Sequence, residues 1–241
     1  MEIFSTRHTI IGLKRTIMCF SPEASFTATA VLVTAGIVAI KEAKFTNKIT
    51  FAVIPILFAV QQFAEGMLWL ALQNPDHDNW RKQSTYMFLI FAQVVWPFWV
   101  PFSIYLMEKK QHAKNILKIL SITGALLSIY LLFRIIVSPI TASIDCNHIY
   151  YNLDVPKYSL ILVDIFYLVF VILPPFISSA RKTSLLGVII VISLIITEIF
   201  YTKALISVWC FFAAILSVVV IYVLRKMPRQ QEKDYKDFHS Y

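Results

Sequence analysis

The chain consists of long apolar runs separated by short polar breaks. The runs are apolar on every face and show neither the alternation of a half-buried strand nor the stripe of an amphipathic helix. About 20 such residues are enough to cross the hydrocarbon core of a bilayer as a helix. Because unpaired backbone groups are too costly in lipid, only helices or a closed barrel can span it, and these runs favour helices.

The pattern therefore predicts an all-α, polytopic membrane protein with seven transmembrane helices in one bundle. Pro97 and Pro101 predict a kink in the third helix, and Pro174 and Pro175 predict one in the fifth. A short polar break between the sixth and seventh helices predicts a tight hairpin. The predicted spans are residues 22–40, 49–73, 85–107, 116–138, 158–179, 185–201 and 204–224.

The distribution of Lys and Arg predicts the orientation, because cytoplasmic loops retain an excess of basic residues. One end of the predicted bundle carries Lys41, Lys44, Lys48, Lys109, Lys110, Lys114, Lys118, Arg181, Lys182, Arg225, Lys226, Arg229, Lys233 and Lys236. The opposite end carries the smaller set of Arg7, Lys14, Arg15, Arg81, Lys82, Lys157 and Lys203. We assign the first end to the cytoplasm, which places the N-terminus outside and the C-terminus inside.

Composition supports a lipid environment. Charged residues make up 15% of the chain, against about 25% in soluble domains, and hydrophobic residues make up 58%. The net charge of +8 does not indicate a nucleic-acid partner, because the basic residues lie in short clusters between apolar runs. The predicted partner is the lipid bilayer, and the basic tail after residue 224 is expected to act as a stop-transfer signal and to contact anionic lipids.

The first 17 residues do not resemble a cleaved signal peptide. They are partly basic, but they lack a sustained apolar region and a small-residue cleavage site. Their positive charge opposes the predicted orientation, so either they are translocated at a cost or translation starts at Met18. The expected organisation is an N-terminal extension at 1–17, a transmembrane domain at 18–224 and a cytoplasmic tail at 225–241.

Several unusual strings begin at Met18. They are MCFSPEASF at 18–26, QQFAEG at 61–66 followed by Trp69, WPFWVP at 96–101 and SVWCFFA at 207–213. With these strings the chain resembles a family of uncharacterised bacterial multi-pass membrane proteins that open with Met-Cys-Phe-Ser. The resemblance implies a bacterial inner-membrane protein without implying a mechanism, and it makes residues 1–17 look like an extension.

Ionisable and amide side chains within the spans are the candidate functional residues, since they are costly in lipid. With the assigned directions, the ionisable groups all fall in the outer half of the membrane. Gln61, Glu65 and Trp69 share one helix face through their spacing of four residues. We therefore predict a polar cavity open to the outside that binds an unknown small ligand, with the candidate residues Gln61, Gln62, Glu65, Trp69, Gln93, Arg134, Asp164, Glu198 and Trp209.

Structural roles compete with binding at several of these positions. Arg134 either extends its guanidinium towards the interface or pairs with a carboxylate such as Glu65 or Asp164. Asp164 and Glu198 lie close enough to an interface to be partly solvated. Trp209 could line the cavity, but core packing is a commoner role for a tryptophan at this depth. Glu65 is the hardest to explain structurally, because it lies well inside its span next to two glutamines.

The cysteines offer two further hypotheses. Cys19 and Cys146 are both assigned to the outer side, where an oxidising envelope allows a disulfide. Alternatively, if Met18 starts the chain and is removed, Cys19 becomes an N-terminal nucleophile or acylation site. The spacing of cysteines and histidines suits neither zinc nor a redox pair, so we predict no metal and no cofactor. The outer connection at 138–158 is expected to be a loop, either one that covers the cavity or a surface loop of ordinary polar content.

Three classes of function remain after these observations. The first is a transporter or channel for a small solute or cation, which ranks highest because of the polar cavity. The second is a receptor-like or assembly protein of the membrane. The third, a membrane-embedded enzyme, is disfavoured because no predicted span contains a histidine that could hold a catalytic metal.

Overall fold

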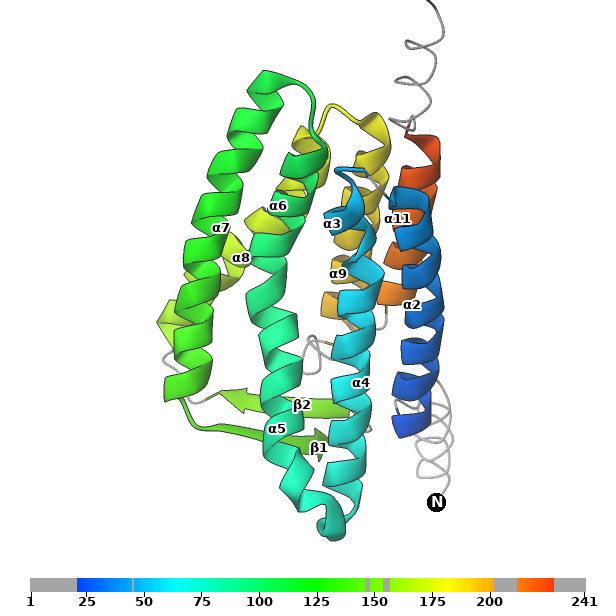
Figure 1. Cartoon of the computed structure of the whole chain (residues 1–241). Coiled ribbons are helices and arrows are strands. Elements are labelled where there is room, and N and C mark those ends of the chain that lie inside the picture. Colours follow the sequence, from blue (N-terminus) through cyan, green and yellow to red (C-terminus); the bar gives the residue numbers. More distant parts are fainter. Residues whose placement is uncertain (1–20, 45, 146–147, 154–156, 202–211, 228–241) are drawn as a thin grey trace, which may run out of the picture.

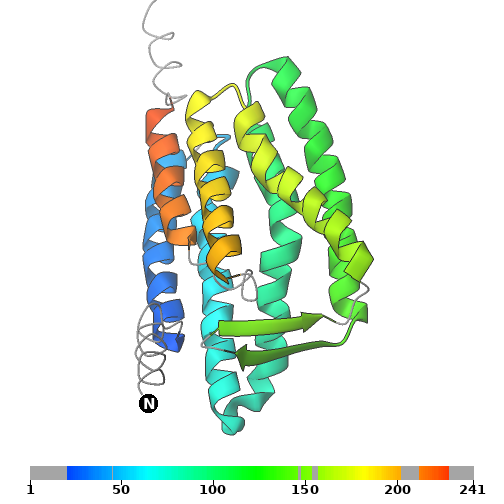
Figure 2. The ribbon, with the colours of Figure 1, turned by 180° about the vertical axis from the view of Figure 1, so that it is seen from behind.

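The computed structural model describes residues 21–44, 46–145, 148–153, 157–201 and 212–227. It shows a bundle of long helices with a two-stranded hairpin across one end (Figures 1 and 2). The α-helices are α2 (Pro22–Ala43), α3 (Ile49–Ala52), α4 (Ile54–Gln73), α5 (Asp78–Leu89), α6 (Trp96–Met107), α7 (Gln111–Val137), α8 (Lys157–Ile177), α9 (Ser184–Tyr201) and α11 (Ala213–Lys226). Three shorter elements are the 3₁₀ helices η1 (Pro75–His77) and η3 (Arg181–Thr183) and the π-helix η2 (Ile90–Val95).

Four helical segments are long and apolar enough to cross a membrane. They are Pro22–Ala43, Ile49–Gln73, Asp78–Met107 and Gln111–Val137, and a shorter apolar helix covers Leu162–Ile177. The mostly helical, membrane-type fold is thus confirmed, while the number of seven spans stays a prediction. The third helix begins at Asp78 rather than at residue 85. Helical hydrogen bonding extends over the mostly polar residues 78–84, which a search for apolar runs does not include.

Large apolar side chains face outward from the sides of the bundle. On α7, Ile119, Leu126 and Phe133 recur every seven residues, and each is 62% exposed. Residues seven apart lie on the same face of a helix. Such an exposed apolar face is unfavourable in water and is what contact with lipid tails requires.

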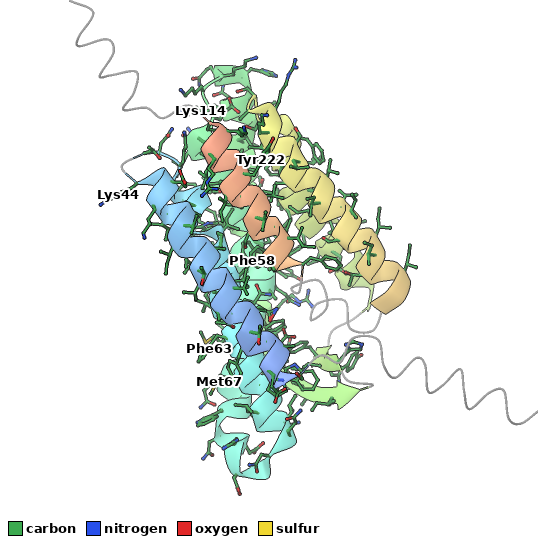
Figure 3. All side chains as sticks on the ribbon, turned by 90° about the vertical axis from the view of Figure 1, so that its right-hand side faces the viewer. Lys44, Phe58, Phe63, Met67, Lys114 and Tyr222 are labelled. Carbon is green, nitrogen blue, oxygen red and sulfur yellow. The ribbon has the colours of Figure 1, made fainter. Side chains whose placement is uncertain are left out.

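The basic residues of the described loops gather at one end of the bundle. There the Asn47 side chain donates from Nδ2 to the Leu106 carbonyl at 2.8 Å, and Arg225 Nε lies 3.0 Å from Glu42 Oε1. These contacts join the α2–α3 connection to the end of α6 and the last turn of α2 to the end of α11. Lys44 and Lys114 lie at this same end (Figure 3), which is called the basic end below.

The residues that were expected to form an outer loop instead form an antiparallel β-hairpin at the opposite end. Strand β1 (Ile140–Asp145) pairs with β2 (His148–Leu153) in a register from Ile140↔Leu153 to Asp145↔His148. The sequence interpretation expected a loop here and did not predict these strands, because each has only six residues. Ala142, Ile149 and Tyr151 are buried on one face, and that burial stabilises the strands.

Candidate functional site

The central feature is a polar turn of α4 inside the bundle, formed by Gln61, Gln62 and Glu65. Gln61 lies at the midpoint of the span Ile49–Gln73, and Glu65 follows one turn closer to the hairpin. The three side chains are 0%, 3% and 2% exposed, and Trp69, one further turn along, is 2% exposed. All four predicted residues of this helix are therefore buried, so a cavity open to the outside at Glu65 would require movement of the packed elements.

The polar turn contacts the third helical segment directly. Trp96, the first residue of α6, donates from Nε1 to Gln61 Oε1 at 3.1 Å. The Phe58 ring stacks on Trp96 with a centroid distance of 4.1 Å. Phe58 lies midway along the bundle (Figure 3), so this contact lies deep between the two ends.

The helix opposite the polar turn is interrupted by the π-helix η2, which contains Gln93. In a π-helix each carbonyl accepts from the N–H five residues later, and for Ala92 that residue is Pro97, which has no N–H. Tyr167 Oη of α8 instead donates to the Ala92 carbonyl at 2.7 Å. The sequence predicted a kink here but not the π-helix or its tyrosine partner, and π-helical turns are frequent at functional sites.

A second carbonyl near the π-helix also lacks its helical N–H donor because of a proline. In a regular helix the Pro97 carbonyl would accept from residue 101, which is also a proline. Gly124 of α7 packs against this carbonyl so closely that a Cβ at position 124 would lie 2.1 Å from the oxygen. Close packing of α6 on α7 thus requires glycine at this position.

Arg134 and Asp164 form no ion pair with Glu65 among the described residues. Arg134 is half-buried, its guanidinium carbon lies 5.9 Å from the centre of the Tyr130 ring, and its Nε has no hydrogen-bond partner among the described residues. Asp164 is exposed on α8 and near enough to Arg134 for their charges to interact. Arg134 and Asp164, both within the described part of the chain, form no ion pair with each other at 4 Å or less.

Some predicted positions are outside the part that the structure describes. Glu198 belongs to the last turns of α9, but its side chain is not among the described ones. Trp209, Cys19 and Cys146 lie outside the described residues, and so does any disulfide between the two cysteines. Their proposed roles stay predictions.

The hairpin covers the polar turn on the side away from the basic end. Trp69 packs in one buried cluster with Phe88, Ile135, Ile149 and Tyr151. The rings of Phe88 and Tyr151 stack with a centroid distance of 4.9 Å. This places three helical segments and β2 together around Trp69, whose Nε1 is buried without a hydrogen-bond partner among the described residues.

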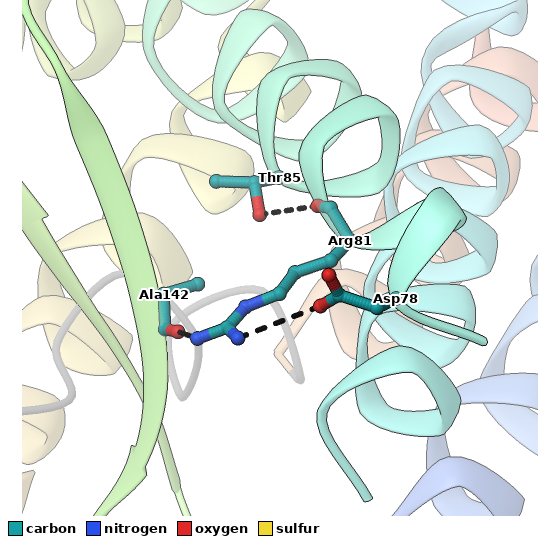
Figure 4. A network of polar contacts seen from close by, with 4 residues as sticks. All are labelled: Asp78, Arg81, Thr85 and Ala142. Atoms are coloured by element: carbon teal, nitrogen blue, oxygen red, sulfur yellow. Dashed lines mark hydrogen bonds and ion pairs between the residues drawn. The ribbon is translucent and has the colours of Figure 1, made fainter. Parts of the chain in front are cut away.

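Arg81 connects the hairpin to α5. Its Nη2 donates to the Ala142 carbonyl of β1 at 2.7 Å, while its Nη1 lies 3.6 Å from Asp78 Oδ1 (Figure 4). Thr85 donates to the Arg81 carbonyl at 2.7 Å. The ion pair is largely exposed and contributes little to stability, so the hydrogen bond to the strand is the more important contact.

Glu108 is a buried carboxylate that the sequence interpretation missed, because it follows the predicted third span and precedes two lysines. It accepts from the amides of Lys109 and Lys110 at 2.8 Å each, from Ser178 Oγ at 3.0 Å, and from the amide of Ser179 at 2.7 Å and its hydroxyl. It thereby joins the α6–α7 connection to the end of α8. Burial raises the pKa of the Glu108 carboxyl, but hydrogen bonds from Ser179, Lys110 and Ser178 outweigh it, so the pKa lies below its ordinary value.

The described residues contain no group of three or more His, Cys, Asp or Glu side chains arranged to hold a metal ion. A polar turn with one carboxylate and two amides can instead bind a small solute or a monovalent cation through oxygen atoms.

Comparison with known proteins identifies one family. The model of a family of unknown function, DUF6629, matches residues 18–235, beginning at the methionine where the resemblance described above begins. No curated protein and no solved structure matches the chain.

Proposed function

The chain belongs to this family of unknown function, and we propose that it is a transporter or channel that binds a small cation or polar solute at Glu65. The observation that carries the proposal is the burial of Gln61, Gln62 and Glu65 near the middle of a span. Ionisable side chains at this depth are costly, and their usual use is to form a substrate or ion pathway.

The chemistry of the polar turn favours a cationic or hydrogen-bonding solute. A carboxylate and two amide carbonyls offer oxygen atoms, which suit alkali cations and protonated amines. Gln61 is held in place by the Trp96 indole, so one amide is oriented before a ligand arrives. The π-helix η2 opposite α4 supplies a segment whose backbone pairing is already irregular.

The test is flux through the purified protein in proteoliposomes. Uptake of radioactive sodium and rubidium, and of protons with a pH-sensitive dye, is compared for wild type, Glu65→Gln and Glu108→Gln, normalised to folded protein. Both variants replace a buried carboxylate by its amide, but only Glu65 belongs to the proposed pathway. We expect Glu65→Gln to abolish cation flux and Glu108→Gln to retain it.

Two results would overturn cation transport through Glu65. Equal flux in wild type and Glu65→Gln would remove Glu65 from the pathway. If liposomes with the wild-type protein took up none of the three cations faster than empty liposomes, cation transport itself would be excluded.

We also propose that the basic end faces the cytoplasm of a bacterial cell, with the N-terminus outside. This assignment is supported by the basic residues at 41–44, 48, 109–118, 181–182 and 225–226, which belong to the helix ends and connections of the end that contains Lys44 and Lys114 (Figure 3). A C-terminal alkaline phosphatase fusion should be inactive and a C-terminal fluorescent protein should fold. An active phosphatase would reverse the orientation.

A further inference from the structure

The helical segment from α5 through η2 to α6 approaches α3 and α4 unequally along its length. The backbone of α4 packs closely against α5 near the hairpin, whereas towards the basic end α3 and α4 approach η2 and α6 much less closely. Aromatic side chains, including Phe58, Trp96 and Trp99, fill the distance between these backbones. We call this region, from Gln61 to the basic end, the inner seam.

Three side-chain hydrogen bonds cross the inner seam in sequence. Trp96 donates to Gln61 at mid-span, Trp99 Nε1 donates to the Thr50 carbonyl at 3.0 Å, and Asn47 donates to the Leu106 carbonyl at the basic end. Each is a single bond from one neutral donor. The net stabilisation from such a bond is small because each partner can hydrogen-bond to water instead. The three bonds can therefore favour the closed seam and still allow it to open.

Two of the acceptors are carbonyls near helix ends. Leu106 lies in the last turn of α6, where carbonyls lack intrahelical donors. Thr50 lies in α3, just before the interruption that separates α3 from α4. These carbonyls would be hydrated if the seam opened, so opening leaves no buried group unpaired on the basic side.

We propose that the inner seam is the inner gate of the protein, with Trp99 and Asn47 as the residues that close it between Glu65 and the basic end. The hairpin and the close α4–α5 packing hold the opposite end, so separation of α4 from α6 opens the seam towards the basic end. That such opening serves solute passage rests on the proposed function, but the opening itself does not.

Thiol accessibility tests the gate. Ser103 on α6 is fully buried, and by helical spacing it shares a face with Trp96, Trp99 and Leu106. Ser103→Cys is nearly isosteric and reports on the inner half of the seam, in a background where the three native cysteines are replaced by serine. Labelling with a membrane-impermeant maleimide is measured separately from the basic end and from the hairpin end in oriented vesicles.

Trp99→Phe removes the indole N–H and keeps most of the ring packing, and Asn47→Ala removes the donor at the exposed end of the seam. We expect each to raise the labelling rate of residue 103 from the basic end by about fivefold, the effect of losing one net hydrogen bond. The matched control is Trp80→Phe, which alters a 44%-exposed tryptophan near the hairpin end and should leave the rate unchanged.

Unchanged labelling in both seam variants would overturn the gate, and so would an equal increase in Trp80→Phe or an increase from the hairpin end. If Trp99→Phe fails to fold, Asn47→Ala still decides, because Asn47 is exposed in a connection. Labelling needs no solute. Therefore, if the labelling results support the gate while Glu65→Gln leaves cation flux unchanged, the proposed binding residue is rejected and the gate is retained.

Discussion

Gly124→Ala is the substitution for which the structure predicts the clearest loss of stability. The new methyl group would lie 2.1 Å from the carbonyl oxygen of Pro97, a backbone atom that cannot rotate away. Reaching even the 3.0 Å lower limit of real Cβ contacts requires α6 and α7 to separate locally by roughly 1 Å. This is overpacking at a helix–helix contact, which costs about 1–3 kcal/mol.

The net effect includes a favourable contribution. Alanine is better than glycine in a helix interior by about 1 kcal/mol. Because the obstacle is backbone, we take the upper part of the overpacking range and expect the free energy of unfolding to fall by about 2 kcal/mol. Gly36→Ala is the matched control, since the atoms that its Cβ would meet closer than 3.0 Å belong to a side chain, Cδ1 and Cγ1 of Ile56 at 2.2 and 2.5 Å. A rotamer change of about 1 kcal/mol roughly cancels the helix gain there.

The assay is thermal and denaturant unfolding of both variants in detergent, followed by tryptophan fluorescence and by the monodisperse fraction in size-exclusion chromatography. Gly124→Ala should be clearly less stable than wild type and Gly36→Ala nearly equal to it. If Gly124→Ala were as stable as wild type, or if Gly36→Ala were the weaker variant, the close contact between α7 and the Pro97 carbonyl would be refuted.

The other predictions concern polar contacts between segments that are distant in the sequence. Tyr167→Phe leaves the Ala92 carbonyl without its donor and should lower the free energy of unfolding by about 1–3 kcal/mol in the same assay; an unchanged value would contradict this role. In the folded state the pKa of Glu108 is lowered from 4.5. Its contribution to the free energy of unfolding is therefore fully present above pH 4.5 and is lost as the pH falls through the folded-state pKa. Melting temperatures of Glu108→Gln should lack that acidic loss, and a pH profile parallel to wild type would refute it. Arg81→Ala should increase protease cleavage of the hairpin about fivefold through loss of the bond to Ala142, and equal cleavage would show that packing alone holds β1.

The candidate site was partly predictable from sequence. Glu65 and its neighbours could be found because a carboxylate or amide in an apolar run stands out locally, and because a spacing of four residues places side chains on one face. The partners of these groups could not be found in the same way. Trp96 is 35 residues from Gln61, and Tyr167 is 75 residues from Ala92.

Glu108 and the hairpin show two further reasons why sequence reasoning missed features. Glu108 looks like an ordinary loop residue beside lysines, and only the approach of Ser178 and Ser179, about 70 residues away, makes it a buried acceptor. The hairpin strands have six residues each and lie between two long apolar runs, so their alternation was too short to be distinguished from a loop.

What the sequence determined by itself is the class of protein, the approximate helix boundaries and the basic end. These properties depend on the transfer of individual residues between water and lipid and on charges next to each span, both of which act locally along the chain. Only the tertiary structure decided that α4 faces the π-helix, that Gly124 meets the Pro97 carbonyl and that β2 packs over Trp69. In lipid the hydrophobic effect does not select helix partners, so close packing and single hydrogen bonds between distant segments make that choice.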